Sequence, residues 1–282
     1  MQRFLGCHVS TAGGLAAAIH NGKALEVNTI QLHPSPPQRW NTKPYPKGFE
    51  DEFNEARKGS GIEKVFFHGI YLINLANPEP QKQHLAKVSL VHYLDLNARI
   101  EGDGVIFHVG SNTHQEKEED GFALAGKAIN AILKESHTQA RLILEVAAGS
   151  GKIIGDRVEE LAAIFEHVQD QERVGFGLDS QHLWASGYDL QGNLEEIVDN
   201  FERVLGLQKI WAIHLNDSKT ECGSKKDRHE NLGQGLIGSK TLAAFINHPK
   251  LAKVPVILET PDLDTPEGAL REVAALRKLA NL

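Results

Sequence analysis

The strongest constraint on the fold is a repeated alternation of short apolar runs with longer amphipathic segments. The runs at 4–8, 29–33, 64–68, 104–108, 141–145, 174–179, 210–214 and 255–259 have the composition of buried strands. A segment with helical periodicity follows each run, although a proline-rich loop at 34–46 precedes the second helix. Strands that alternate with helices are typical of a parallel sheet covered by helices.

Eight strand–helix units within 282 residues predict an α/β fold of the (β/α)8 TIM-barrel type. We expect residues 1–282 to form a single domain, because no change of composition marks a linker. A doubly wound open sheet is the alternative. No G-x-G-x-x-G motif follows the first strand to support it.

Composition and charge restrict the function further. Only two cysteines, Cys7 and Cys222, are present, and no secretory signal or apolar run of about eighteen residues occurs. We therefore expect a cytoplasmic protein with no membrane segment. The net charge of −7 argues against a purely electrostatic nucleic-acid binder, unless the acidic residues hold cations. Three divalent ions would bring the charge close to zero.

The predicted strands from the third to the eighth all end in residues of the metal-ligand type. These residues are His68, His108, Glu145, Asp179, His214 and Glu259. A single histidine at a strand end is more often a rim residue, but the strand ends of a barrel converge on one mouth. Unpaired carboxylates at such a mouth would repel one another, and metal ions remove that cost.

Two loops add candidate ligands. His182 is expected in the loop just after Asp179, and the polar stretch 214–238 contains Asp227 and His229. Asp227 and His229 are two positions apart and face the same side of an extended segment. Taken alone, this stretch is equally consistent with a polar surface loop. Together the nine candidates suffice for three ions that share one carboxylate, and imidazole–carboxylate sets suit zinc.

Six segments carry a resemblance to a known family. They are HVSTAGGL at 8–15, HGIYLINLANP at 68–78, HVGS at 108–111, LDSQHLWASGYDL at 178–190, HLNDSKTECGSKKDRHENLGQGLIG at 214–238 and ILET at 257–260. In this order they resemble endonuclease IV, the deoxyribonuclease IV family of zinc-dependent apurinic/apyrimidinic endonucleases. The resemblance covers almost the whole chain, and the block at 214–238 is its most specific part.

The resemblance implies three zinc ions per chain and no organic cofactor. The implied ligand sets are His68, His108 and Glu145 for the first ion, Glu145, Asp179, His214 and Glu259 for the second, and His182, Asp227 and His229 for the third. Glu145 bridges two ions, and the residues of the first two sets carry the catalysis. The implied reaction is hydrolysis of the phosphodiester 5′ to an abasic site in duplex DNA, which leaves a 3′-hydroxyl and a 5′-deoxyribose phosphate.

The same resemblance suggests DNA contacts. Tyr71 and Leu72 match positions that in the family probe the minor groove of DNA. Arg39 lies near a third DNA-probing position of the family. Lys219 and Arg228 are candidate phosphate contacts, since cations position a protein on the backbone. The simpler interpretation of Tyr71 is an aromatic residue that caps the barrel rim, and that of Lys219 and Arg228 is a solvated charged loop.

The chain departs from the family where Val146-Ala147 replaces Asn-Thr after Glu145, which removes polar groups next to the ligands.

Two other functions fit the same barrel. A sugar isomerase or epimerase also places Glu, Asp and His at strand ends, but it needs only one or two ions. A lesion-binding module without catalysis would not require all nine ligands. We expect a monomer whose partner is duplex DNA with abasic sites.

Overall fold

Eight parallel strands close into a barrel. The computed structural model describes residues 2–40, 45–113 and 116–282. The barrel strands are β1 (Leu5–His8), β2 (Thr29–Leu32), β3 (Lys64–His68), β4 (Gly104–Phe107), β5 (Leu142–Glu145), β6 (Val174–Asp179), β7 (Ile210–His214) and β10 (Val256–Leu258). Their order around the closed barrel is β1-β10-β7-β6-β5-β4-β3-β2. The predicted TIM barrel is confirmed.

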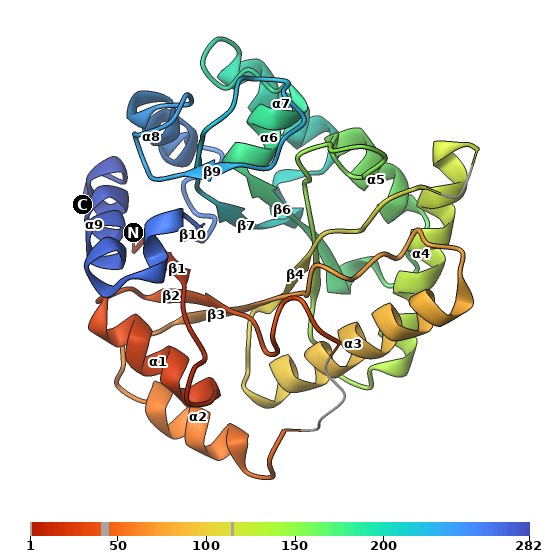
Figure 1. The fold of residues 1–282 in the computed structure, drawn as a ribbon, viewed down its shortest axis with the longest axis horizontal. Coiled ribbons are helices and arrows are strands. Elements are labelled where there is room, and N and C mark those ends of the chain that lie inside the picture. The colour runs from red at the N-terminus through yellow and green to blue at the C-terminus, as the bar shows by residue number, and fades with distance from the viewer. Residues whose placement is uncertain (1, 41–44, 114–115) are drawn as a thin grey trace.

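Helices surround the strands (Figure 1). They are α1 (Leu15–Ala24), α2 (Phe49–Arg57), α3 (Pro80–Arg99), α4 (Glu118–Glu135), α5 (Val158–Glu166), α6 (Ser180–Ser186), α7 (Leu194–Val204), α8 (Ser239–Asn247) and α9 (Pro266–Leu279), with short 3-10 turns η1 (Gln171–Arg173), η2 (Leu207–Lys209) and η3 (Pro261–Asp264). The proline-rich stretch 34–46 contains no helix in its described part, and residues 41–44 lie outside the described ranges. None of the helices in the described ranges is long and apolar enough to cross a membrane.

The barrel has an apolar layer in its interior. The layer consists of Phe66, Ile106, Ile143, Ala212 and Ile257, all of which are buried. Neighbouring residues on the same strands, such as Val65 and Phe67, belong to the larger core between strands and helices. This alternation follows from the period of two along a strand. The same period of two means that the residue two positions further along each of these strands also faces the barrel interior.

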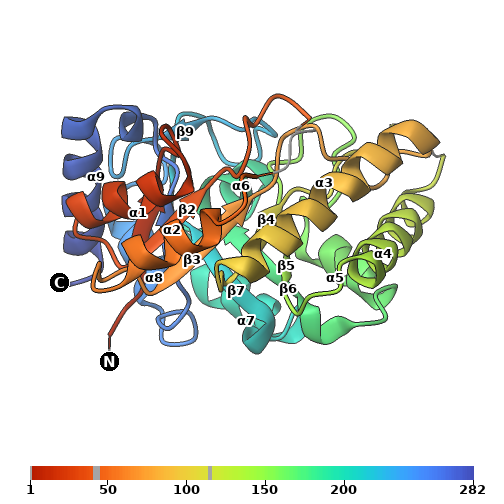
Figure 2. The ribbon, with the colours of Figure 1, turned by 90° about the horizontal axis from the view of Figure 1, so that it is seen from below.

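The long connection between β7 and α8 contains a small antiparallel ribbon of β8 (Asp217–Ser218) and β9 (His229–Glu230). In the side view, β9 and α6 lie at one end of the barrel, and the N-terminus points away from the other end (Figure 2). The connections that follow the strands therefore gather at one end, where the site is built.

Candidate metal centre

Six candidate residues lie one step beyond the apolar layer. A residue two positions after an inward-facing one also faces inward. The pairs are Phe66 with His68, Ile106 with His108, Ile143 with Glu145, Ala212 with His214 and Ile257 with Glu259, and Asp179 follows Gly177 in the same way. The strands β4 and β10 end one residue before His108 and Glu259. The barrel thus stacks a charged layer directly on an apolar one.

Glu145, at the end of β5, is the centre of this charged layer. Its side chain is enclosed, with 1% of the residue exposed. Its carboxylate oxygens lie 2.8 Å from His214 Nδ1, 3.0 Å from His68 Nε2 and 3.4 Å from His108 Nε2. The carboxylate faces three imidazoles from different strands and belongs to two groups of residues that could hold a metal ion.

A second group consists of Glu145, Asp179, His214 and Glu259. One ligand atom from each lies within 4.8 Å of the others. His214 Nδ1 is 3.3 Å from Glu259 Oε2 and 3.9 Å from Asp179 Oδ2. A set of three carboxylates and one imidazole can hold a divalent cation.

The position of His182 differs from the prediction. It lies in the short helix α6 and not in a loop. Asp179 caps this helix, because its Oδ1 accepts a hydrogen bond from the His182 backbone N–H at 2.7 Å. The turn of helix brings His182 Nε2 to 3.4 Å from both Asp227 Oδ2 and His229 Nε2. A helix of seven residues is too short for its periodicity to be recognised in sequence.

Asp227 and His229 share one face of their segment, as their spacing predicts. Asp227 Oδ1 lies 3.3 Å from His229 Nε2. One ligand atom each of His182, His229 and Asp179 also lies within 4.8 Å of the others. This third group is the more open one, since 56% of the Asp227 side chain is exposed.

A buried aspartate organises the loop that carries this group. Asp217 accepts hydrogen bonds from the backbone N–H groups of Gly233 at 3.0 Å, Ile237 at 2.9 Å and Gly238 at 3.2 Å. The ribbon pairs Ser218 with His229. The loop is therefore a folded unit that presents His229 in a defined direction.

Burial disfavours the charged forms of His214, Glu259 and Glu145, but the opposite charges around them outweigh it, whereas burial lowers the pKa of His108 to about 4. Burial lowers the pKa of His214, yet Glu259 and Glu145 raise this pKa to about 9. Burial raises the pKa of Glu259, yet His214 and His68 lower this pKa to about 2. The pKa of Glu145 lies well below its usual range because His108 and His214 overcome its desolvation. Protons on the imidazoles thus balance the carboxylates, and a cation would compete with them.

The donor set fits divalent metal ions. Among the described residues, no lysine or arginine forms an ion pair with Glu145, Asp179 or Glu259. In the metal-free protein protonated imidazoles offset these buried carboxylates, and a metal ion would take the place of those protons. Imidazole and carboxylate donors at this density are typical of zinc sites.

The sequence interpretation missed Gln31 on β2. This fully buried side chain lies between two members of the second group. Its Oε1 is 2.7 Å from His214 Nε2, and its Nε2 donates a hydrogen bond of 2.5 Å to Glu259 Oε1. A glutamine between the apolar residues Ile30 and Leu32 of a predicted buried strand was the available signal.

The first two strands also end in histidines. His8 ends β1 and His33 follows β2, with ring centroids 4.6 Å apart. Burial lowers the pKa of His8 to about 4. Burial, together with His68 and His8, lowers the pKa of His33 to about 3. Both rings are therefore neutral at pH 7, and they extend the polar lining of the mouth to β1 and β2.

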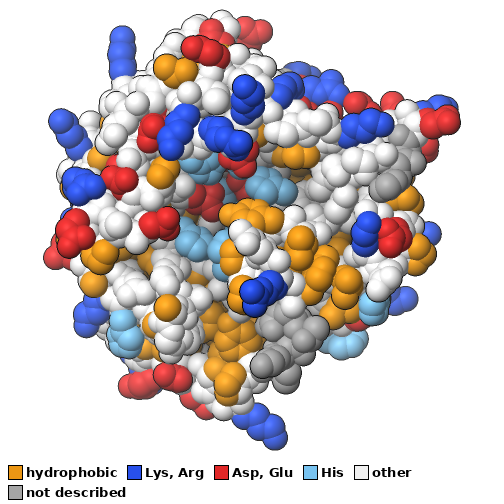
Figure 3. Space-filling view, in the orientation of Figure 1, with side chains coloured by type: hydrophobic (Ala, Val, Ile, Leu, Met, Phe, Trp, Pro, Cys, Tyr) orange, Lys and Arg blue, Asp and Glu red, His pale blue; other side chains and the backbone are white. Residues whose placement is uncertain are grey.

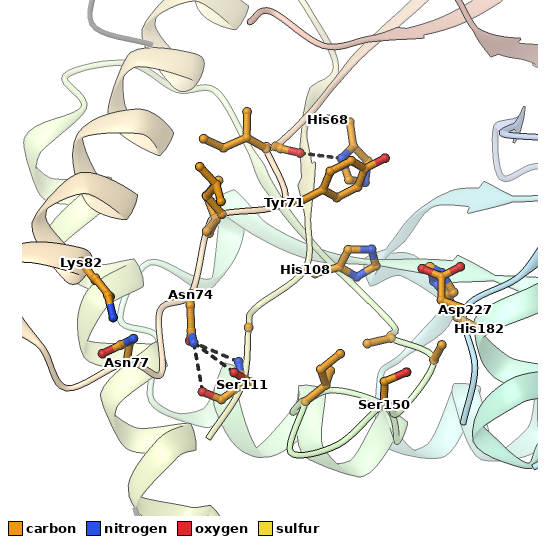
Figure 4. A pocket seen from close by; sticks show the side chains of 18 of the residues that line it. His68, Tyr71, Asn74, Asn77, Lys82, His108, Ser111, Ser150, His182 and Asp227 are labelled. Atoms are coloured by element: carbon orange, nitrogen blue, oxygen red, sulfur yellow. Dashed lines mark hydrogen bonds and ion pairs between the residues drawn. The ribbon is translucent and has the colours of Figure 1, made fainter. Parts of the chain in front are cut away.

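Two cavities open beside the charged layer. The larger, about 570 Å³, reaches from His68 and His108 to Trp40 and α3 (Figure 4). The smaller, about 320 Å³, lies over His8 and His33. Tyr71 borders both cavities.

The structure places the predicted DNA-contacting residues on the surface. Tyr71 and Leu72 are 65% and 41% exposed. Arg39, Lys219 and Arg228 also reach the surface. Figure 3 shows histidine and acidic side chains in a central hollow of this face, with lysine and arginine side chains near its edge.

The fold and the mouth define the class of protein. Residues 19–279 match the family described as Xylose isomerase-like TIM barrel. A D-tagatose 3-epimerase-like protein superposes with a TM-score of 0.73 over 98% of this chain and 97% of its own at 13% identity, which shows the fold alone.

Relatives at higher identity are more specific. The chain is 35% identical over 273 residues to "Probable endonuclease 4" of Clostridium botulinum, covering 97% of each chain. It is 35% identical over 273 residues to "Apurinic-apyrimidinic endonuclease" of Caenorhabditis elegans, covering 94% of this chain and 68% of the relative. Endonuclease IV from Thermus thermophilus superposes with a TM-score of 0.87 at 28% identity, covering 98% of each chain. The chain belongs to the endonuclease IV family.

Proposed function

We propose that the protein is a zinc-dependent apurinic/apyrimidinic endonuclease. In this proposal it hydrolyses the phosphodiester 5′ to an abasic site in duplex DNA and leaves a 3′-hydroxyl and a 5′-deoxyribose phosphate. The observation that carries the proposal is the single mouth at which nine histidine, aspartate and glutamate side chains meet. The names of the relatives from Clostridium botulinum and Caenorhabditis elegans support the same activity.

Three zinc ions are proposed, in sets that the distances support. The sets are His68, His108 and Glu145; Glu145, Asp179, His214 and Glu259; and His182, Asp227 and His229. Zinc at this mouth would supply a Lewis acid for the phosphodiester and a water of lowered pKa. The protein contributes the enclosed carboxylates and the closed barrel rim, which keep the donors in place and limit access of bulk water.

The rim is suited to a distorted DNA strand. An abasic nucleotide lacks stacking and pairing and is extruded at low cost. The larger cavity lies beside His68 and His108 and has room for such a nucleotide. In this proposal the exposed side chains of Tyr71 and Leu72 contact the minor groove, and Arg39, Lys219 and Arg228 contact phosphates.

A sugar isomerase or epimerase would use the same barrel. The fold alone does not separate the two activities, since epimerase-like barrels superpose well on this chain. The third group of His182, Asp227 and His229 has no purpose in a site that needs one or two ions. This group favours the nuclease.

The test uses a duplex with one stable abasic analogue. The zinc-loaded protein is incubated with strands labelled at either end, and the products are resolved on a sequencing gel. We expect a single cut directly 5′ to the lesion, with a 3′ end that a DNA polymerase extends without further treatment. Failure to cut the abasic duplex under zinc-replete conditions, or a cut on the 3′ side of the lesion, would refute the proposal. A matched undamaged duplex is the control.

Size-exclusion chromatography with light scattering tests the remaining expectation of a monomer. A cytoplasmic location also stays a prediction.

A further inference from the structure

The candidate imidazole ligands differ in how the ring nitrogen that the proposed sets do not assign to an ion, here called the rear nitrogen, is held; that of His182 also lies 3.3 Å from Glu145 Oε1. In four of the five, this rear nitrogen has an oxygen acceptor. The pairs are His68 Nδ1 with Gly69 O at 2.8 Å, His182 Nδ1 with Val146 O at 3.0 Å, His229 Nδ1 with Glu259 O at 3.1 Å and His214 Nε2 with Gln31 Oε1 at 2.7 Å. Such a bond fixes both the tautomer and the orientation of the ring.

His108 is the exception. Its Nε2 faces Glu145 Oε2 at 3.4 Å, which leaves Nδ1 as the rear nitrogen. This Nδ1 is enclosed by protein atoms and has no hydrogen-bond partner within residues 2–40, 45–113 and 116–282. The side chain is 28% exposed, compared with 4% for His68 and 1% for His214.

The surroundings of His108 explain the missing acceptor. His108 follows β4, and Val146 and Ala147 follow Glu145, the last residue of the adjacent strand β5. Ala147 lines the larger cavity together with His108 and offers no side-chain oxygen. Its backbone N–H donates to Gly155 O at 2.9 Å. Position 147 thus contributes no hydroxyl or amide to the cavity that His108 lines.

An imidazole whose rear nitrogen has no hydrogen-bond acceptor lowers the metal affinity of its site. Loss of the bond behind a ligating histidine typically lowers metal affinity by roughly 10- to 100-fold. The charge balance acts in the same direction. Glu145 is the only carboxylate in the group of His68, His108 and Glu145, and it also belongs to the second group. The group of His182 and His229 has Asp227 within 3.4 Å of both rings.

We infer that the site formed by His68, His108 and Glu145 is the labile one of the three. It binds its ion at least about tenfold more weakly than the other two, so its ion is lost first to a chelator and its occupancy follows the free metal concentration. The inference rests on the proposed function, because it takes the mouth to hold three ions. It adds that one ion is exchangeable, so that the availability of metal regulates the activity.

The first test follows ion release from the fully loaded protein. Excess chelator is added, and the ions remaining with the protein are counted by elemental analysis after rapid desalting. We expect a fast phase of one ion per chain and a slow phase of two. In His108→Ala the loaded protein should hold one ion fewer and show no fast phase. In His20→Ala, which removes an exposed histidine of α1, both phases should remain.

A second measurement needs no variant. Crystals of the loaded protein are soaked briefly in chelator, and the occupancy of each site is read from zinc-edge anomalous maps. We expect density to fall first between His68, His108 and Glu145. Release in a single phase, a fast phase that persists in His108→Ala, or earlier loss at another site would overturn the inference.

Cleavage of the abasic duplex separates the two claims. Correct cleavage together with the wrong order of release leaves the proposed function standing and rejects the labile site. The expected order of release without any cleavage would reject the proposed function and leave the labile site standing.

Discussion

The two successive layers of side chains inside the barrel share their strands but not their chemistry. The lower layer, with Phe66 and Ile143 among its members, is apolar and buried. The upper layer, two residues later on each strand, is made of imidazoles and carboxylates around Glu145. The lower layer contributes stability through burial. The upper layer buries charged groups, which costs desolvation free energy, so it is explained by function.

The largest effect is expected from removing the bridging carboxylate. Glu145→Ala should lower kcat for the abasic duplex by at least about a thousandfold, because electrostatic stabilisation worth several kcal/mol is lost. Elemental analysis should show fewer than three zinc ions per chain. Full activity of the zinc-replete variant would contradict the role assigned to Glu145.

Ile143→Ala probes the layer below on the same strand. Truncation of this fully buried side chain should lower the free energy of unfolding by roughly 2–5 kcal/mol. Below the melting temperature, kcat and the zinc content should stay within a few-fold of the unaltered protein. Chemical denaturation and elemental analysis measure the stability and the zinc content. A loss of zinc with unchanged stability would mean that the layers are not separable.

The upper layer should respond to pH in opposite ways with and without metal. In the metal-free protein, Glu259 and Glu145 overcome burial and raise the pKa of His214 from 6.5 to about 9. This group stabilises the metal-free fold fully below pH 6.5, and the contribution is lost as the pH rises through 9. Metal binding requires neutral imidazoles, so the loaded protein should gain stability over the same interval.

Calorimetry from about pH 6 to 9, with and without chelator, checks these slopes. We expect Tm to change by a few degrees in opposite directions. The control is His214→Gln, in which the slope of the metal-free protein should flatten. Parallel slopes in the two forms would contradict the competition between protons and metal.

The smallest effect concerns the rim. Lys219→Ala and Arg228→Ala should each raise KM for the abasic duplex a few-fold and reduce the slope of log KM against log salt by about one. Lys253→Ala is the matched control, since Lys253 precedes β10 at the other end of the barrel. Unchanged salt dependence in both variants would remove these two residues from the DNA contacts.

The sequence predicted those features that repeat from strand to strand. An apolar residue followed two positions later by histidine or a carboxylate recurs on most strands from β3 to β10, and both parts were recognisable. Gln31 was missed because an amide side chain is not of the metal-ligand type, and His8, which like Asp179 has a glycine two positions before it, was not singled out.

Features that depend on short or backbone interactions could not be predicted. The helix α6 and the ribbon of β8 and β9 are too short to show a period. The acceptors behind His68, His182 and His229 are backbone carbonyls, which every residue carries. Their absence behind His108, within the described part of the chain, is a property of the folded protein alone.

Zinc-edge anomalous diffraction from untreated crystals of the zinc-loaded protein tests the central claim most directly. We predict three peaks at the mouth of the barrel, with Glu145 between two of them and His182, Asp227 and His229 around the third. A mouth without anomalous density, or zinc bound only at other places on the surface, would contradict the account.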